Sequence, residues 1–108
     1  KPVLATGSPG GSTIITVVLQ VILNTIDFGM NIAEATAAPR VHHQWRPDQL
    51  LLEPLIGSDT RRLLQKMGHK VSTSSRQLGK LQSIRADGGV LFGSSDNRWP
   101  GSSVAAAE

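Results

Sequence analysis

The stretch GSPGGSTIITVVLQVILNTID, residues 7–27, decides the fold, because a glycine-rich turn leads directly into a long apolar segment. The segment is rich in β-branched residues, which by propensity favour a strand. Its polar residues nevertheless recur at spacings of four, four and three, at Thr16, Gln20, Asn24 and Asp27. That spacing draws one narrow polar stripe along a helix and fits no two-residue alternation. We therefore expect a mostly buried helix from Ser12, its N-cap, to about Asp27, with Gly29 as the stop.

Gly10 and Gly11 stand at the mouth of this helix. Paired glycines leave backbone N–H groups accessible, so that an anion or a developing oxyanion approaches them without meeting a Cβ. Two glycines before a helix are also typical of a tight strand-to-helix turn without a catalytic role, and the pattern leaves both interpretations open. The spacing fits neither the Gly-x-x-x-x-Gly-Lys-Ser/Thr loop nor the Gly-x-Gly-x-x-Gly loop. The local pattern therefore does not indicate phosphate binding.

Length and composition bound the architecture. The 108 residues, 39% of them hydrophobic, are enough for one small domain. Much of the apolar content lies in one helix that must be covered on most of its circumference, so we expect segments outside this sequence to complete the core. The apolar runs fall short of the roughly 20 residues that span a bilayer, and no membrane span is expected. The absence of cysteine excludes disulfides and thiolate metal sites.

The net charge of +3 raises the question of a nucleic-acid partner. The basic residues are scattered, broken by carboxylates and not interleaved with aromatic residues, which favours a solvated surface and no nucleic-acid partner. Besides Lys1 they are Arg40, Arg46, Arg61, Arg62, Lys66, Lys70, Arg76, Lys80, Arg85 and Arg98.

The rest of the chain predicts short helices and strands. Asn31 and Glu34 form a capping-box-like start to a helix that runs through Ala38. A second helix begins with Ser58 or Asp59 as its N-cap and ends at Gly68. Strands are expected at residues 3–6, 40–45, 50–52 and 70–74, and a hairpin at 82–86 and 90–93 around Asp87-Gly88-Gly89. This order indicates an α+β fold, with a loosely ordered tail over residues 97–108.

Three polar constellations are candidates for chemistry. His42 and His43 are adjacent, so on a strand they point to opposite faces, which favours a structural pair over a metal site; no metal or cofactor is expected. A Ser-His-Asp triad can be drawn from Ser8 or Ser12, His42 or His43, and Asp48, although no Gly-x-Ser-x-Gly elbow is present. Asp96 and Arg98 are expected to form an exposed ion pair that contributes about 0–1 kcal/mol.

Several of these motifs, in this order, resemble the C-terminal part of the gamma-glutamyltranspeptidase family. The resemblance extends to about Arg98. It rests on residues 6–12 (TGSPGGS), 31–35 (NIAEA), 38–45 (APRVHHQW), 79–84 (GKLQSI) and 93–96 (GSSD).

The resemblance implies part of an N-terminal-nucleophile hydrolase, a four-layer αββα sandwich whose precursor cuts itself into a large and a small subunit. It also implies that residues 1–108 are a C-terminal fragment of the small subunit, and that Gly10 and Gly11 supply the oxyanion hole through their backbone N–H groups. In such enzymes a threonine forms an acyl-enzyme with the γ-glutamyl group of a substrate such as glutathione and passes it to water or an amine. That threonine lies upstream, so neither Thr6 nor Thr13 is the nucleophile, and this chain alone is expected to be inactive.

The implied partners are the remainder of the small subunit and the large subunit of the same precursor. The resemblance favours a bacterial enzyme that is periplasmic or secreted. Two alternatives stay open: a fragment of a related acylase with another acyl substrate, and a non-catalytic structural module.

Overall fold

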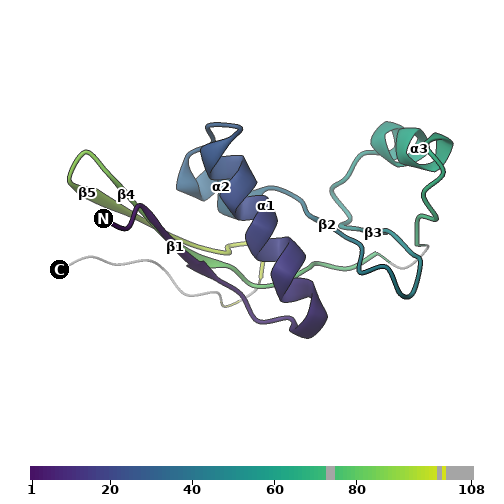
Figure 1. Cartoon of the computed structure of the whole chain (residues 1–108), viewed down its shortest axis with the longest axis horizontal. Helices are drawn as coiled ribbons and strands as arrows, with labels where there is room; N and C mark the ends of the chain where they lie inside the picture. Colours follow the sequence, from purple (N-terminus) through teal and green to yellow (C-terminus); the bar gives the residue numbers. More distant parts are fainter. Residues whose placement is uncertain (73–74, 100, 102–108) are drawn as a thin grey trace.

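The computed structural model describes residues 1–72, 75–99 and 101. Strands and short helices alternate along the chain, and in Figure 1 the α1 and α2 helices lie over a three-stranded sheet while α3 lies at the opposite end. In chain order the elements are β1 (Leu4–Gly7), the 3-10 turn η1 (Gly11–Thr13), α1 (Ile14–Ile26), α2 (Ile32–Ala37), β2 (Val41–His42), β3 (Leu51–Leu52), α3 (Ser58–Lys66), β4 (Gln82–Asp87) and β5 (Val90–Ser95).

The larger sheet is antiparallel with the strand order β1-β4-β5. The β4–β5 hairpin turns at Gly88 and Gly89, whose φ angles of 56° and 81° suit a two-residue turn that needs positive φ at both positions. The strand predicted at residues 3–6 and the predicted hairpin are confirmed. Both hairpin strands are longer than predicted and reach Asp87 and Ser95.

The hydrophobic core lies between this sheet and the two helices over it. α1 packs against β1 and α2, while α2 packs against β4 and β5. The buried core residues are Val17, Val21, Ile32, Ala35, Leu78 and Leu81. The last two come from the segment that leads into β4, which therefore passes directly beneath α1.

The helix predicted from the polar spacing is confirmed as α1, but its start differs. η1 precedes it, and Thr13 stands at its N-cap without a side-chain cap. Ser12 is not the N-cap, because its hydroxyl donates to Gln44 Oε1 at 2.8 Å. The helix ends at Ile26, and Gly29 with φ 65° follows at the predicted stop.

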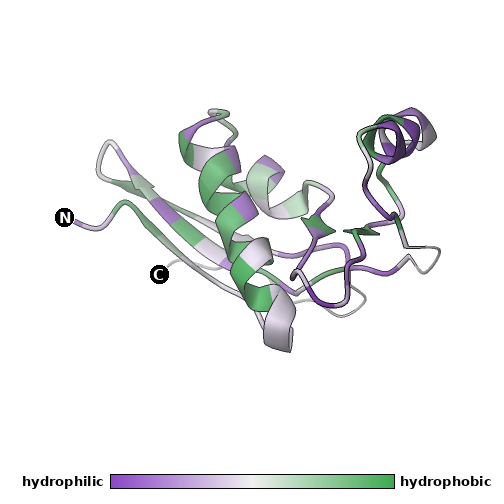
Figure 2. Ribbon diagram, turned by 45° about the vertical axis from the view of Figure 1, so that its right-hand side comes forward, coloured by the Kyte–Doolittle hydropathy of each residue, from purple (hydrophilic) through white to green (hydrophobic). Residues whose placement is uncertain are grey.

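α1 is buried on one face only, although most of its ribbon in Figure 2 has the green of hydrophobic residues. Val17 and Val21 are fully buried, whereas Ile15 is 77% exposed on the opposite face. The polar stripe borders the buried face, where Gln20 Nε2 donates to Val41 O at 2.7 Å and Gln20 Oε1 accepts from Val41 N at 2.9 Å. Nothing in the described residues covers the outer apolar face of α1, so the expected burial of most of this helix requires segments outside this sequence.

α2 begins as its sequence predicts. Asn31 Oδ1 accepts from the Glu34 N–H at 2.9 Å, and the Glu34 carboxylate accepts from the Asn31 N–H at 3.2 Å. This reciprocal capping box satisfies two N–H groups that the first turn leaves without helical partners. The helix ends at Ala37, just before Pro39.

The remaining strands are shorter than the apolar pattern predicts. β2 ends at His42, whereas the predicted strand reaches residue 45. Trp45 has a φ of 69°, which a strand residue does not adopt. β3 covers two of the three predicted residues. Of the strand predicted at 70–74, the described part has only an isolated bridge from Val71 to Leu50, and residues 73–74 lie outside the described residues.

α3 is confirmed with a small shift, because Gly57 stands at its N-cap and Gly68 follows its last turn with a φ of 97°. A loosely ordered tail was expected over residues 97–108. Residues 100 and 102–108 of this tail lie outside the described part. No helix in the described part is long and apolar enough to cross a bilayer. The mixture of helices and antiparallel sheets confirms the predicted α+β class.

Candidate functional site

The turn at Gly10 and Gly11 is an exposed backbone corner between β1 and α1. Gly10 has a φ of 145° and Gly11 a φ of 57°, so both positions favour glycine. A Cβ on Gly10 would lie 2.5 Å from Thr13 Oγ1, whereas a Cβ on Gly11 would meet no heavy atom within 4 Å. Within the described residues, no hydrogen bond is donated by the backbone N–H of either glycine. Two adjacent N–H groups are thus available to a ligand.

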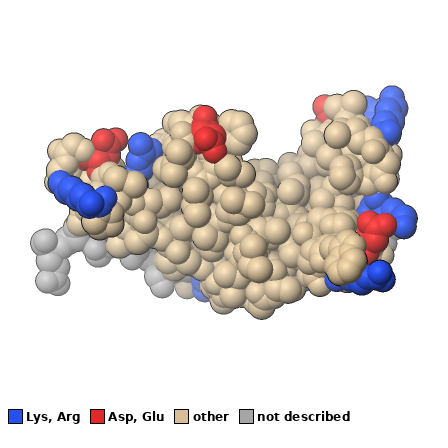
Figure 3. All heavy atoms as spheres, in the orientation of Figure 1, with Lys and Arg blue, Asp and Glu red and all other residues tan. Residues whose placement is uncertain are grey.

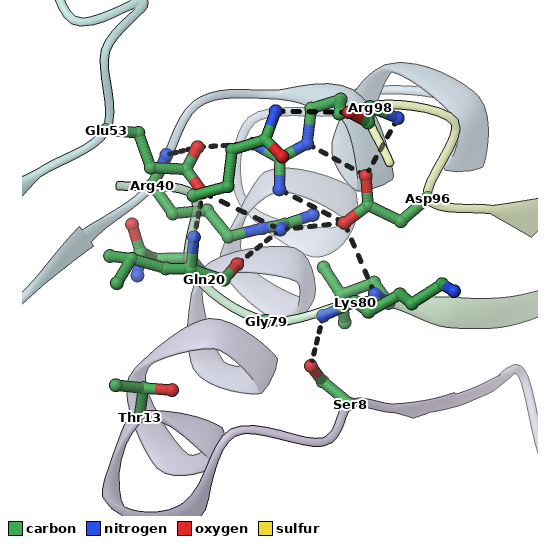
Figure 4. Close-up of polar contacts among 12 residues, drawn as sticks. Ser8, Thr13, Gln20, Arg40, Glu53, Gly79, Lys80, Asp96 and Arg98 are labelled. Carbon is green, nitrogen blue, oxygen red and sulfur yellow. Dashed lines mark hydrogen bonds and ion pairs between the residues drawn. The ribbon is translucent and has the colours of Figure 1, made fainter. Parts of the chain in front are cut away.

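Two hydroxyl groups hold the carbonyls of this turn. Ser8 Oγ donates to Pro9 O at 2.7 Å and accepts from the Lys80 N–H at 2.8 Å. Thr13 Oγ1 donates to Gly10 O at 2.8 Å, and the Thr13 N–H donates to the same oxygen at 3.1 Å. Figure 4 shows Ser8 below Lys80, with the contact between them dashed. The turn is therefore fixed both to its own helix and to the segment that leads into β4.

A chain of side-chain hydrogen bonds holds the other side of the turn. Ser12 Oγ donates to Gln44 Oε1, and His42 Nε2 lies 2.8 Å from that oxygen. An amide oxygen only accepts, so the Nε2 of His42 carries a proton. His42 Nδ1 lies 2.6 Å from the Oγ1 of Thr16, a residue in the first turn of α1. The two elements involved, α1 and the loop after β2, are thereby joined beside the glycines.

Four charged side chains form a buried group that we call the ionic cluster: Arg40, Glu53, Asp96 and Arg98. Figure 4 shows them above Ser8, beyond Gly79 and Lys80. Arg40 Nη1 donates to Asp96 Oδ2 at 2.9 Å, and Arg98 Nε donates to Asp96 Oδ1 at 2.8 Å. Arg98 Nη1 also donates to Glu53 Oε2. Two cations and two carboxylates thus neutralise one another away from water.

The ionic cluster holds the segment at 78–81. Arg40 Nη1 donates to Leu78 O at 2.7 Å, and the Leu78 N–H donates to Glu53 Oε1 at 2.6 Å. The Leu81 N–H donates to Asp96 Oδ2 at 3.3 Å. Gly79 lies between these anchors, where a Cβ would be 2.5 Å from Ser8 Oγ and 2.8 Å from Val17 Cγ1. The cluster therefore fixes the part of the chain against which Ser8 rests.

Burial and hydrogen bonds act in opposite directions on the pKa of Asp96. Burial raises that pKa, but hydrogen bonds from Arg98 and Arg40 together with their positive charges outweigh it, so the net pKa lies below its ordinary value of 3.8. Asp96 is therefore ionised at neutral pH although its side chain is fully buried.

The sequence predicted the Asp96–Arg98 pair but placed it on the surface, and that placement is wrong, because the side chains of Asp96 and Arg98 are 0% and 8% exposed. The solvated surface predicted for the basic residues is likewise wrong for Arg40, which is 1% exposed. Sequence reasoning missed the roles of Glu53, Ser8 and Gln20. Their partners are backbone groups or residues far apart in the chain. The signals in the sequence were the two family motifs that contain Ser8 and Gly79-Lys80.

The structure does not assemble the triad drawn from the sequence. His43 Nε2 lies 3.2 Å from Asp48 Oδ1 on the surface, and neither Ser8 nor Ser12 bonds to a histidine. Among the described residues, no group of three or more histidine or acidic side chains lies close enough to hold a metal ion. The glycine turn is therefore the candidate site.

A large hollow lies elsewhere, between α2 and the β4–β5 hairpin. It is open, has a volume of about 1240 Å³, and is lined by residues such as Ile32, Ile84 and Phe92 with Arg85 and Asp87 at its edge. None of the described residues that line this hollow forms a contact between a nucleophile and a base. We therefore interpret the hollow as a surface left uncovered in this chain, not as a catalytic site.

The chain resembles known proteins over nearly its whole length. The family model described as gamma-glutamyltranspeptidase matches residues 1–106. The glutathione hydrolase proenzyme of Escherichia coli strain K12 is 52% identical over 99 residues, which cover 91% of this chain and 17% of that relative. This chain thus spans about a sixth of the length of that curated relative.

Solved structures agree with the family match. The T380A mutant of Helicobacter pylori gamma-glutamyltranspeptidase superposes with a TM-score of 0.82 at 46% identity, covering 90% of this chain and 54% of that chain. A cephalosporin acylase from Bacillus halodurans superposes with a TM-score of 0.87 at 33% identity, covering 100% of this chain and 20% of that chain. These neighbours confirm the predicted fold, an α+β part of an N-terminal-nucleophile hydrolase sandwich.

Proposed function

This chain belongs to the gamma-glutamyltranspeptidase family, and from this premise we propose that it is the C-terminal part of the small subunit of an enzyme that cleaves γ-glutamyl amides. The proposed substrate class includes glutathione, and the proposed acceptors are water and amines. Catalysis belongs to the complete protein, in which a threonine outside this chain forms the acyl-enzyme. This chain supplies the oxyanion hole through the N–H groups of Gly10 and Gly11.

One observation carries the proposal: two adjacent N–H groups have no partner among the described residues, on a turn whose carbonyls are held. When a nucleophile attacks an acyl carbon, its carbonyl oxygen becomes an oxyanion. Donors that are already oriented stabilise this charge without reorganising during the reaction, and removing one typically lowers turnover by about 10²–10³. The start of α1 adds the positive end of a helix dipole to the same place.

The two threonines nearest the turn are not proposed as nucleophiles. Thr6 Oγ1 lies 2.7 Å from Ser83 Oγ, and Thr13 Oγ1 donates to Gly10 O. Neither hydroxyl contacts a general base, so neither is activated for attack.

A related acylase with another acyl substrate is the second candidate. The superposition on the Bacillus halodurans cephalosporin acylase favours it, because the same backbone accommodates an acylase. An oxyanion hole serves any acyl substrate, so the choice between the two rests on residues outside this chain. A non-catalytic structural module is the third, and the accessible N–H groups argue against it.

The proposed partners are the remainder of the small subunit and the large subunit of the same precursor. The proposed compartment is the periplasm or the exterior of a bacterial cell.

The test is cleavage of γ-glutamyl-p-nitroanilide, with and without glycylglycine, by this chain alone and by the complete protein. We expect activity only in the complete protein, raised by glycylglycine. A folded complete protein that releases no p-nitroaniline but hydrolyses another acyl amide would establish the acylase alternative. Activity of the isolated chain would contradict the proposal that the nucleophile lies outside it.

A further inference from the structure

We propose that Ser8 and Thr13 are positioning residues, each of which aims one of the two N–H groups of the oxyanion hole. The proposal rests on the function proposed above. It starts from a geometric fact: in a trans peptide, the carbonyl oxygen of one residue and the N–H of the next lie in the same plane and point in opposite directions. Whatever holds the carbonyl therefore also sets the direction of the N–H.

Ser8 sets the direction of the Gly10 N–H. The peptide between Pro9 and Gly10 is trans, since the only cis peptide in the described part joins Arg46 and Pro47. Ser8 Oγ donates to Pro9 O at 2.7 Å, so this oxygen is held on the Ser8 side and the Gly10 N–H points away from it. No other hydrogen bond within the described residues holds Pro9 O.

Thr13 sets the direction of the Gly11 N–H in the same way. Gly10 O accepts from Thr13 Oγ1 at 2.8 Å and from the Thr13 N–H at 3.1 Å. These two bonds hold the peptide between Gly10 and Gly11, and Thr13 itself is only 5% exposed at the base of α1. We call each held carbonyl a clamp. The Thr13 clamp on Gly10 O therefore has two donors, whereas the Ser8 clamp on Pro9 O has one.

Glycine makes these clamps necessary. The two glycines have no Cβ to restrict rotation of the peptides around them, and both occupy positive φ. Without a held carbonyl, the N–H groups would have to be oriented during the reaction, which is the cost that a preformed oxyanion hole avoids.

The Ser8 clamp is also anchored from far along the chain. Ser8 Oγ accepts from the Lys80 N–H, and Gly79 beside it has its carbonyl held by the indole N–H of Trp99 at 2.7 Å. Figure 4 shows Ser8 next to the backbone of Gly79 and Lys80. The hydroxyl donates one hydrogen bond and accepts another, and these two contacts together set its orientation.

The test uses the complete protein with Ser8→Ala and Thr13→Val. We expect the kcat for γ-glutamyl-p-nitroanilide to fall about 10- to 100-fold for Ser8→Ala, less than the loss of a donor itself, while KM changes little. Thr13→Val should lower kcat less, because the Thr13 N–H still holds Gly10 O. Affinity for a boronic acid analogue of the γ-glutamyl group, which forms a tetrahedral anion, should fall in parallel with kcat.

Matched controls separate positioning from loss of stability. Thr25→Val removes a hydroxyl that donates to Val21 O in the same helix, and Ser83→Ala removes a buried hydroxyl that bonds to Thr6. Both should leave kcat unchanged even where they lower Tm. Thr13→Ser, which restores the hydroxyl, should recover the kcat of the original protein.

Crystal structures of the two variants give a readout that does not depend on activity. We expect the Pro9–Gly10 peptide to rotate in Ser8→Ala and the Gly10–Gly11 peptide to shift in Thr13→Val. Unchanged peptide planes together with unchanged kcat would overturn the positioning roles. If the unmodified protein cleaves no γ-glutamyl amide, the proposed function fails, and the peptide planes in the variant structures still decide whether these hydroxyls orient the turn.

Discussion

Gly10 and Gly11 are neighbours in the chain with different surroundings. A Cβ on Gly10 would lie 2.5 Å from Thr13 Oγ1, the hydroxyl that holds the turn, and its φ of 145° lies in a region that residues with side chains rarely adopt. Gly11 has a φ of 57° in the left-handed helical region and open space around it. A side chain is therefore far more disruptive at Gly10.

This difference gives the first prediction. Gly11→Ala should lower the free energy of unfolding of the complete protein by about 1–2 kcal/mol, the cost of a left-handed residue with a Cβ, and should lower kcat less than Gly10→Ala does. Gly10→Ala should displace Thr13 Oγ1 and lower kcat at least tenfold more than Gly11→Ala does. Thermal unfolding and γ-glutamyl-p-nitroanilide turnover of both variants measure this. Equal kcat values in the two variants would contradict it.

At the residue scale, the sequence predicts where glycine is needed but not what holds it. The pair Gly10-Gly11 before an apolar helix indicates an accessible turn from local pattern alone. The Ser8 clamp depends on Lys80, 72 positions along the chain, and on the passage of its backbone beside β1. No spacing rule relates two such residues, so only the fold reveals their contact.

Among the elements, the ionic cluster joins the ends of α2, β3 and β5 to the segment at 78–81. Arg40 and Asp96 are buried and form an ion pair of 2.9 Å, although Arg40 Nε has no hydrogen-bond partner among the described residues. Removing one partner of such a pair leaves an uncompensated charge, which typically costs about 3–5 kcal/mol.

The second prediction concerns Asp96→Asn. We expect the complete protein to lose about 3–5 kcal/mol of unfolding free energy, because two buried guanidinium groups then share one carboxylate. Denaturant unfolding at pH 7 measures the change. The matched control is Asp48→Asn, which breaks an exposed pair with Lys70 and should leave the midpoint unchanged. Equal midpoints for the two variants would mean that the cluster does not hold the elements together.

The third prediction follows from the lowered pKa of Asp96. A carboxyl whose folded-state pKa lies below its unfolded value adds stability that is present above the unfolded pKa, near 3.8, and is lost as the pH falls through the folded value. The unmodified protein should therefore lose stability below about pH 4 more steeply than Asp96→Asn does. Acid unfolding curves followed by circular dichroism test this, and parallel curves would contradict it.

At the element scale, local signals predicted local structure well. The Asn31 and Glu34 capping box, the Gly88-Gly89 hairpin and the helical period of α1 all arise within a few residues of one another. Strand length was overestimated at 40–45, where β2 ends at His42 and Trp45 has a φ of 69°. Propensity does not contain that information.

Over the whole molecule, the described part leaves one apolar surface without cover. The outer stripe of α1 exposes Ile15 by 77% and Ile26 by 63%, with Leu19 and Leu23 between them. In Figure 3 charged side chains gather at the two ends of the molecule, and few lie over α1 in the middle. The helical period could predict that such a stripe exists, but not which side of the helix this chain covers itself.

The last prediction concerns the chain on its own. We expect the isolated 108-residue chain to self-associate and to bind the apolar dye 8-anilinonaphthalene-1-sulfonate, because an exposed apolar stripe of this kind is covered in stable proteins. Leu19→Glu should reduce both effects in the isolated chain and weaken folding of the complete protein. Leu63→Glu, at an exposed leucine of α3, is the matched control and should reduce neither effect to the same degree. Sedimentation velocity and dye fluorescence provide the measurements. A monomeric isolated chain without dye binding would show that the α1 stripe tolerates water. The expectation that segments outside this sequence complete the core over α1 would then lose its physical basis.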